Sequence, residues 1–167
     1  ASGEELEADI VVTATGLDLI PLGGLDLEVD GERVDLPSRM TYKGMMLGGV
    51  PNLAFALGYT NASWTLKADL TCQYVCRLLA HMDEHGHRVC TPRPDPSVEP
   101  EPFIDFTSGY VLRALDRFPK QGSRPPWKLH QNYVRDLVQL RYGSVDDGAV
   151  EFSRGALVER PAEPLAA

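Results

Sequence analysis

Five prolines within twelve residues limit the fold of this 167-residue chain more than any other feature. They stand in residues 91–102, TPRPDPSVEPEP. Proline fixes its own φ angle and has no N–H to donate, so it interrupts helices and central strands alike. We therefore expect residues 91–102 to run extended across the surface as a linker, outside any helix or sheet ladder.

The part before the linker contains two predicted buried strands. The first is ADIVVTATGL (residues 8–17), which is rich in β-branched residues and ends near Gly16. The second is residues 53–57, a short apolar run that Gly58 stops. Between them, apolar and polar residues alternate on both sides of Asp30-Gly31, a dipeptide that favours a β-hairpin.

One long amphipathic helix is predicted between the second strand and the linker. From about residue 64 to residue 84, apolar residues recur with the helical period and fall within an arc of about 120°. The arc contains Ala68, Cys72, Val75, Cys76, Leu79 and Met82. Asn61 or Ser63 can cap the start of this helix, and Gly86 is suited to end it.

The part after the linker is predicted to be helical. FIDFTSGYVLRALDRF forms a helix that ends before Pro119, and WKLHQNYVRDLVQLRY forms a second one with Val134, Leu137 and Val138 on one face. We expect the last dozen residues to be a frayed tail. Together the predicted strands and helices indicate the α/β fold class.

Charge and composition exclude several classes of partner. Lys and Arg number 16 against 24 Asp and Glu, which gives a formal net charge of −8. Such a chain lacks the clustered basic surface that nucleic acid and anionic membranes attract. Its longest apolar-leaning stretch, GMMLGGVPNLAFALGY, falls short of the ~20 residues that span a bilayer. Three cysteines are an odd and small number for a secreted disulfide framework, so we expect a cytoplasmic protein.

Cysteines and histidines between residues 72 and 90 raise the alternative of a zinc site. The six are Cys72, Cys76, His81, His85, His87 and Cys90. On one straight helix, Cys72 and Cys76 lie on the apolar face, whereas His81 and His85 lie about 180° away. The two pairs cannot then share a metal ion. We expect buried thiols, solvated histidines and no metal site.

Both predicted strands end in small residues that suit a cofactor. Ala14, Thr15 and Gly16 close the first strand, and Gly58 leads from the second into the capped helix. In open α/β sheets, ligands bind at the carboxyl ends of strands, and a helix N-terminus attracts anionic groups. Small residues let the backbone approach such a ligand closely. Simple turns have the same composition, so spacing alone leaves both interpretations open.

Five segments carry a resemblance to a known family, in this order: DIVVTATGLDL, YKGMMLGGVPNLAFALGYTNASWTLKADL, YVCRLLAHMDEHG, SGYVLRALDRFPKQGSRPPW and QNYVRDL. Together they resemble the C-terminal part of class B flavoprotein monooxygenases, the Baeyer–Villiger and flavin-containing monooxygenases. Within that family, the segments are most similar to an ethionamide-activating branch. The resemblance extends from about Asp9 to Phe152 and is most specific from Tyr42 to Gly86.

The resemblance implies a Rossmann-like flavoprotein with two dinucleotide-binding domains, one for FAD and one for NADPH. Members use both cofactors to reduce O2 to a flavin peroxide, which transfers one oxygen atom to a small-molecule ketone, sulfide or thioamide. The family's two G-x-G-x-x-G fingerprints do not occur in this chain. We therefore expect the closing part of such an enzyme, which holds no catalytic residue and is inactive alone.

The resemblance also implies roles for particular residues. The implied cofactor contacts are Ala14, Thr15, Gly16, Gly58, Tyr59, Thr60, Asn61 and Trp64. Tyr59 stands where related disulfide reductases carry an Asp, so backbone contacts to the flavin are the safer expectation. Tyr42, Met45 and Met46 are implied to line the substrate pocket, and a plain core role is an equal alternative for the two methionines.

The resemblance implies four parts of the chain. Residues 1–40 end the NADPH domain and return to the FAD domain, and residues 41–90 supply the closing strand and helix of the FAD domain. Residues 91–102 are the linker, and residues 103–167 form a C-terminal helical extension and tail. The alternative function is a non-catalytic α/β module, which binds a partner or a second copy through apolar surface left uncovered.

Overall fold

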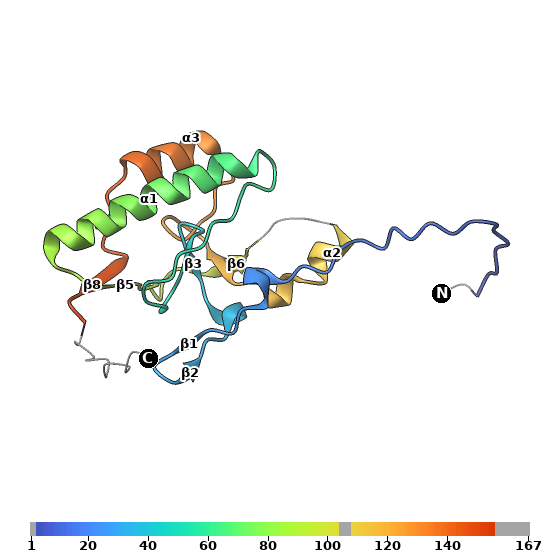
Figure 1. Cartoon of the computed structure of the whole chain (residues 1–167), viewed down its shortest axis with the longest axis horizontal. Helices are drawn as coiled ribbons and strands as arrows, with labels where there is room; N and C mark the ends of the chain where they lie inside the picture. Colours follow the sequence, from blue (N-terminus) through green and yellow to red (C-terminus); the bar gives the residue numbers. More distant parts are fainter. Residues whose placement is uncertain (1–2, 104–107, 156–167) are drawn as a thin grey trace, which may run out of the picture.

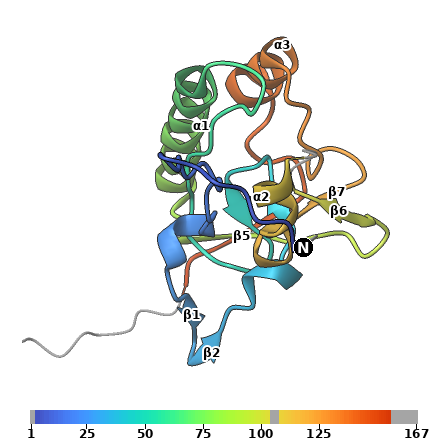
Figure 2. The ribbon, with the colours of Figure 1, turned by 90° about the vertical axis from the view of Figure 1, so that its right-hand side faces the viewer.

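The computed structural model describes residues 3–103 and 108–155. One long helix, α1 (Trp64–His85), lies over a set of short antiparallel strand pairs, and α3 (Tyr133–Asp136) runs beside it (Figures 1 and 2). The π-helix η4 (Leu137–Tyr142) continues α3 and also packs on α1. The other helical elements of the described residues are α2 (Gly109–Leu112) and three short 3-10 helices, η1 (Pro21–Gly24), η2 (Leu36–Ser38) and η3 (Leu115–Arg117).

The predicted helix is confirmed, and the prediction of its buried face is correct for Met82 but wrong for Cys72, Cys76 and Leu79. Gly86 ends α1 in the left-handed conformation, as expected. The buried stripe contains Lys67, Leu70, Thr71, Tyr74, Leu78 and Met82. Cys72 and Cys76, which we expected in the core, are exposed, and Leu79 is 54% exposed. The helix therefore carries two neighbouring stripes of residues. The stripe with more polar residues packs on the core, and we call the exposed one, which contains Cys72, Cys76 and Leu79, the outer stripe.

Two tight hairpins position the centre of the molecule. The hairpin predicted at Asp30-Gly31 is confirmed, since it joins β1 (Glu28–Val29) to β2 (Glu32–Arg33) and both turn residues have positive φ. A second hairpin joins β3 (Thr41–Tyr42) to β4 (Met46–Leu47). Its turn has three residues, and the first two, Lys43 and Gly44, have positive φ, as tight hairpin turns often require.

The prolines in residues 91–102 do not prevent sheet pairing, so that prediction is wrong. Strand β5 (Val89–Pro92) pairs with β8 (Val150–Ser153), and β6 (Pro100–Pro102) pairs with β7 (Lys120–Gly122). Both sheets have only two strands, so every strand has one unpaired edge. A proline whose nitrogen faces that edge removes no hydrogen bond from the ladder. The segment therefore pairs with two strands from the C-terminal part of the chain instead of crossing the surface as a linker.

The two buried strands that we predicted are not formed as such. Residues 3–20 run outward as an extended trace, and Ile10 is 82% exposed (Figure 1). Residues 53–57 are extended and alternate between half-buried and exposed, yet they have no ladder partner among the described residues. Strands of this kind need neighbouring strands on both edges, and the described chain supplies none.

The C-terminal part is helical in shorter pieces than predicted. Helix α2 (Gly109–Leu112) is followed by η3, and α3 by η4. Val134 and Val138, predicted on one apolar face, are exposed, whereas Leu140 is fully buried. Residues 104–107 and the predicted tail from residue 156 onward lie outside the described residues. Within the described part of the chain, no helix has the length and apolar character that a membrane span needs.

The main core lies between α1, the β3–β4 hairpin and the C-terminal strands. Its most completely buried side chains include Trp127, Tyr42, Tyr74, Met45, Met46, Leu70 and Leu140. A smaller cluster, Phe103, Ala114 and Phe118, packs with Leu19 and Leu57. The loop that leads into α1 lies between these two clusters, because Leu57 packs on the smaller one and Leu70 on the larger.

Candidate functional site

The candidate site is the loop of residues 58–61, which joins the extended segment 53–57 to the start of α1. Gly58 is buried against the first residue of the helix. A Cβ added to Gly58 would lie 2.3 Å from Trp64 Cγ and 2.6 Å from its Cα. Only glycine fits, because the loop backbone and the Trp64 ring are packed directly on each other.

Tyr59 is anchored to a buried ion pair. Its hydroxyl donates a hydrogen bond of 2.7 Å to Asp136 Oδ2. The same oxygen accepts an ion pair of 2.9 Å from Lys67 Nζ, and both partners are less than 10% exposed. Burial, and next the bond to Asp136, raises the pKa of Tyr59 well above its ordinary value, so the phenol stays neutral.

Gln131 holds the next two residues of the loop. Its Oε1 accepts hydrogen bonds from the Thr60 backbone N–H at 3.1 Å and from the Thr60 hydroxyl at 3.2 Å. Its backbone carbonyl accepts a third bond, of 3.1 Å, from Asn61 Nδ2. Gln131 itself has a φ of 49°, a left-handed conformation that costs a non-glycine residue free energy.

Little space remains beneath the loop. A cavity of about 10 Å³ is lined by the loop and its supports: Gly44, Leu57, Gly58, Tyr59, Lys67, Phe103, Leu129, His130, Gln131 and Asp136. This volume is close to the minimum for one water molecule. Burial is also the main reason that the pKa of His130 is lowered. The inner side of the loop is therefore a packed support, and a ligand has access only from its outer side.

A larger cavity lies beside Trp64, along the extended segment that leads into the loop. Its volume is about 260 Å³, and its walls are apolar: Leu19, Ile20, Pro21, Leu22, Phe55, Ala56, Leu57, Trp64, Phe103, Phe118 and Pro119. Trp64 is 60% exposed and Ile20 59% exposed. Small-molecule sites typically combine such apolar walls with a few polar groups at one end.

The predicted contacts Ala14, Thr15 and Gly16 lie apart from this loop. They belong to the exposed N-terminal trace, and Gly16 has a φ of 92° beside Tyr110. Asp18, two residues on, forms an ion pair with Arg117. The structure thus brings Gly58, Tyr59, Thr60, Asn61 and Trp64 together at one end of α1, while a cofactor contact for the earlier triplet stays a prediction.

The residues predicted to line the substrate pocket lie in the main core. Tyr42 and Met45 have no exposed surface, and Met46 has 1%. The Tyr42 ring packs edge-on against Trp127, with 5.5 Å between ring centroids. Their packing stabilises the β3–β4 hairpin, and a substrate contact for these three side chains stays a prediction.

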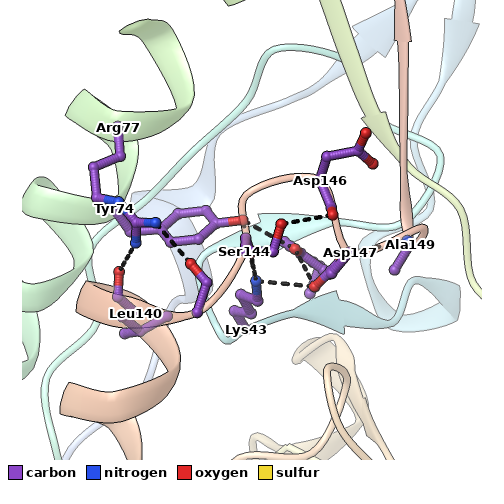
Figure 3. A network of polar contacts seen from close by, with 10 residues as sticks. Lys43, Tyr74, Arg77, Leu140, Ser144, Asp146, Asp147 and Ala149 are labelled. Atoms are coloured by element: carbon purple, nitrogen blue, oxygen red, sulfur yellow. Dashed lines mark hydrogen bonds and ion pairs between the residues drawn. The ribbon is translucent and has the colours of Figure 1, made fainter. Parts of the chain in front are cut away.

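A second buried polar network surrounds Lys43 (Figure 3). Its Nζ lies 2.9 Å from Asp147 Oδ2 and donates to the Tyr74 hydroxyl at 3.1 Å. The Tyr42 hydroxyl lies 3.0 Å from that of Tyr74 and donates to Asp147 at 2.8 Å. Burial lowers the pKa of Lys43, an effect that Asp147 opposes, and burial raises the pKa of Tyr74 to about 12.

Arg77 extends this network to the end of η4. It donates to the backbone carbonyls of Leu140 at 2.8 Å and Gly143 at 2.7 Å (Figure 3). These carbonyls belong to the last turn of a helix, where no intrahelical N–H is available. A charged side chain from α1 therefore replaces the missing donors and fixes the C-terminal segment onto the helix.

The cysteines and histidines form no metal centre among the described residues. The three histidine rings cluster at the end of α1, where His81 and His87 both pack on Phe152. Cys90 is buried and burial raises the pKa of its thiol. Cys72 and Cys76 are free and exposed on the outer stripe of α1.

Sequence reasoning missed the residues that support the loop. The sequence patterns assigned no role to Lys67 or Asp136, although each is nearly fully buried. Two signals could have found them. Lys67 lies in helical register with Leu70 and Leu78. The segment QNYVRDL, which contains Gln131 and Asp136, carried part of the family resemblance without any assigned role.

Comparison with known proteins finds relatives among FAD-containing monooxygenases. The FAD-containing monooxygenase EthA of Mycobacterium tuberculosis is 56% identical over 154 residues, which is 92% of this chain and 32% of EthA. EthA of Mycolicibacterium smegmatis is 53% identical over 154 residues, 92% of the chain and 31% of that protein. The chain is homologous to FAD-containing monooxygenases.

A relative of lower identity is also named as a monooxygenase. A protein of Acinetobacter baylyi named "Probable FAD-binding monooxygenase AlmA" is 43% identical over 166 residues, 98% of this chain and 33% of AlmA. The chain spans about a third of the length of the curated relatives it matches. No family model matches the chain, and no solved structure matches it either.

Proposed function

We propose that this chain acts as the C-terminal third of a longer FAD- and NADPH-dependent monooxygenase. The observation that carries the proposal is 56% identity, over 92% of the chain, to a relative named FAD-containing monooxygenase. Residues 1–40 would end the NADPH domain, residues 41–90 would close a Rossmann-like FAD domain, and residues 91–102 would lead into a C-terminal extension, residues 103–167.

The residues at the start of α1 fit a cofactor on their outer side. Helix α1 has no side-chain cap, because the Ser63 hydroxyl contacts Thr65 instead. Its first N–H groups are thus open to ligand oxygens. The backbone of Gly58, Tyr59 and Thr60, together with Asn61 and Trp64, would hold FAD there. When bound, FAD supplies the redox chemistry that joins NADPH to O2.

The proposed reaction consumes one O2, one NADPH and one proton for each substrate. One oxygen atom inserts beside the carbonyl of a ketone or adds to the sulfur of a sulfide or thioamide, and the other leaves as water. NADPH supplies the two electrons and becomes NADP⁺. In this reaction the described residues bind and orient, since Tyr59 is held neutral and its proton is engaged with Asp136.

Isotopically labelled O2 tests the reaction in the longer protein that carries this chain. With FAD, NADPH and methyl phenyl sulfide as the probe, the sulfoxide should contain one labelled oxygen atom, and NADPH oxidation should rise when the sulfide is added. Product without label, or NADPH oxidation that does not respond to ketones, sulfides or thioamides, would contradict the proposed activity.

The alternative function, a partner-binding module, is supported by a different observation. The outer stripe of α1 and the N-terminal residues 10–12 are apolar and exposed. Surfaces of this kind mark interfaces. Under the main proposal the upstream domains of the same protein cover them, so the isolated chain should pair with those domains one to one. Light scattering that shows a stable self-associated chain, indifferent to the upstream domains, would favour the alternative.

We also propose a cytoplasmic location for the longer protein. Cys72, Cys76 and Cys90 are all free in the structure. Two of them are exposed, and exposed thiols persist more readily in a reducing compartment. Fractionation of cells that express the protein from its own gene would test this point.

A further inference from the structure

One short segment supports the whole loop that precedes α1. Residues 131–136 lie between Trp127 and η4, far along the chain from the loop of residues 58–61. Gln131 contacts Thr60 and Asn61, and Asp136 contacts Tyr59. Every loop residue after Gly58 thus has a polar partner in residues 131–136.

We propose that Gln131 and Asp136 are positioning residues, which fix the conformation of residues 58–61 for cofactor binding. The proposal rests on the proposed function, because it concerns the same loop that we propose to bind FAD. Both residues line the packed cavity beneath the loop, where Asp136 is buried and Gln131 is half-buried. They would therefore act on FAD through Tyr59 and Thr60.

The geometry of Gln131 favours a role in positioning over simple surface contact. One amide oxygen accepts from both the N–H and the hydroxyl of Thr60, so it fixes the backbone and the side chain together. Gln131 reaches them from a left-handed backbone. Such strain persists only where the surrounding contacts determine the conformation.

Asp136 is placed by its own helix. The Asn132 side chain caps α3 by accepting from the Arg135 N–H at 3.1 Å, and the Asp136 N–H bonds to the Asn132 carbonyl at 3.0 Å. This cap sets the direction of Asp136, whose carboxylate balances the buried Lys67 charge while it accepts from Tyr59. A buried charge without its partner is strongly unfavourable, so the pair holds α3 and α1 in one arrangement.

FAD affinity in the longer protein tests the role of Gln131. Gln131→Ala removes the oxygen that Thr60 uses twice, and we expect the Kd for FAD to rise about tenfold. Gln131→Glu keeps an oxygen at that position and should restore most of the affinity. Gln73→Ala is the matched control, since Gln73 bonds only to Asp69 on the exposed face of α1 among the contacts described.

Three readouts separate positioning from general destabilisation. Thermal unfolding identifies any variant that fails to fold, and Thr60→Val and Thr60→Ser then probe the same contact from the loop side, where only the valine variant should weaken FAD binding. The visible circular dichroism of bound flavin should change in Gln131→Ala but not in Gln73→Ala. Unchanged FAD affinity and flavin spectrum in Gln131→Ala and Thr60→Val would overturn the proposal. Failure of the unmodified protein to bind FAD would instead overturn the proposed function.

Discussion

At the scale of single residues, Asp136 combines a buried ion pair with a buried hydrogen bond. One oxygen of its carboxylate serves Lys67 and Tyr59, which come from different elements. A buried ion pair adds little net stability compared with an apolar pair, because both charges lose their hydration. Its removal on one side is costly, because the other charge is left buried without a partner.

The first prediction follows from that asymmetry. Asp136→Asn keeps the shape of the side chain and an acceptor for Tyr59, but it leaves Lys67 without a counter-charge. We expect the free energy of unfolding to fall by about 3 kcal/mol, measured by urea denaturation of this chain. Glu151→Gln breaks the exposed pair with Arg93 and should cost less than about 1 kcal/mol. Equal losses in the two variants would contradict the account.

Gly58 carries the second prediction. A Cβ at this position collides with the Trp64 ring and backbone, so Gly58→Ala should destabilise the chain by about 1–3 kcal/mol. Gly109→Ala is the control, because its Cβ would lie 3.5 Å from the nearest atom, at ordinary contact distance. Both variants can be compared by thermal unfolding. A Gly58→Ala variant as stable as Gly109→Ala would show that the loop is not packed on Trp64.

At the scale of elements, α1 shows what sequence periodicity can and cannot predict. The helix, its glycine terminus and the Asp30-Gly31 hairpin all follow from local patterns, and the structure confirms them. The buried stripe was mispredicted because Lys67 and Tyr74 look polar in the sequence. Their polar groups are satisfied by Asp136, Tyr42 and Lys43, which are distant in sequence and invisible to a periodicity argument.

Adjacent leucines on α1 test the assignment of its stripes. Leu78 is 3% exposed and Leu79 is 54% exposed. Leu78→Ala should lower the free energy of unfolding by about 3 kcal/mol, because it leaves a cavity in the main core. Leu79→Ala should change it by less than about 0.5 kcal/mol in the isolated chain. A larger loss for Leu79→Ala than for Leu78→Ala in denaturant unfolding would show that the face predicted from the sequence is the buried one.

The network around Lys43 makes stability depend on alkaline pH. Tyr74 has a pKa of about 12 in the folded chain against an ordinary value of 10.0, so the folded state holds its proton more tightly between these values. The free energy of unfolding should therefore fall as pH rises from about 10 to about 12, by up to about 3 kcal/mol from Tyr74. Lys43 opposes this below about pH 10.5, because burial lowers its pKa.

Tyr74→Phe isolates the contribution of that phenol. The variant should be less stable at neutral pH by about 1 kcal/mol, since it loses its bonds to Tyr42 and Lys43. Its stability should then decline less steeply than that of the unmodified chain between about pH 10 and pH 12. Parallel declines, measured by urea denaturation at each pH, would show that Tyr74 does not control the alkaline loss.

Strands were harder to predict than helices in this chain. The β-branched run at residues 10–13 has strand composition, yet composition cannot show whether a neighbouring strand exists. The opposite error occurred in the proline-rich segment, where strands formed although none was predicted. An edge strand tolerates a proline whose nitrogen faces away from the partner strand. In both cases the outcome depends on pairing partners, which local sequence does not specify.

At the scale of the whole molecule, the chain exposes apolar surface on two separate segments. Residues 10–12 and the outer stripe of α1 are exposed in the chain, which spans about a third of its curated relatives. Part of the candidate site was predictable, since the junction at Gly58 follows from the sequence pattern and the roles of its neighbours were implied by the family resemblance. Their supports, Gln131 and Asp136, required the tertiary fold.

FAD titration of this chain beside the longer protein that carries it tests the central claim most directly. The account predicts that the longer protein binds one FAD tightly, whereas the chain alone, with its folded α1 and supported loop, binds none stoichiometrically. Far-ultraviolet circular dichroism of the chain would establish that it is folded during the titration. Tight one-to-one FAD binding by the chain alone, or the lack of FAD binding by the longer protein, would contradict the account.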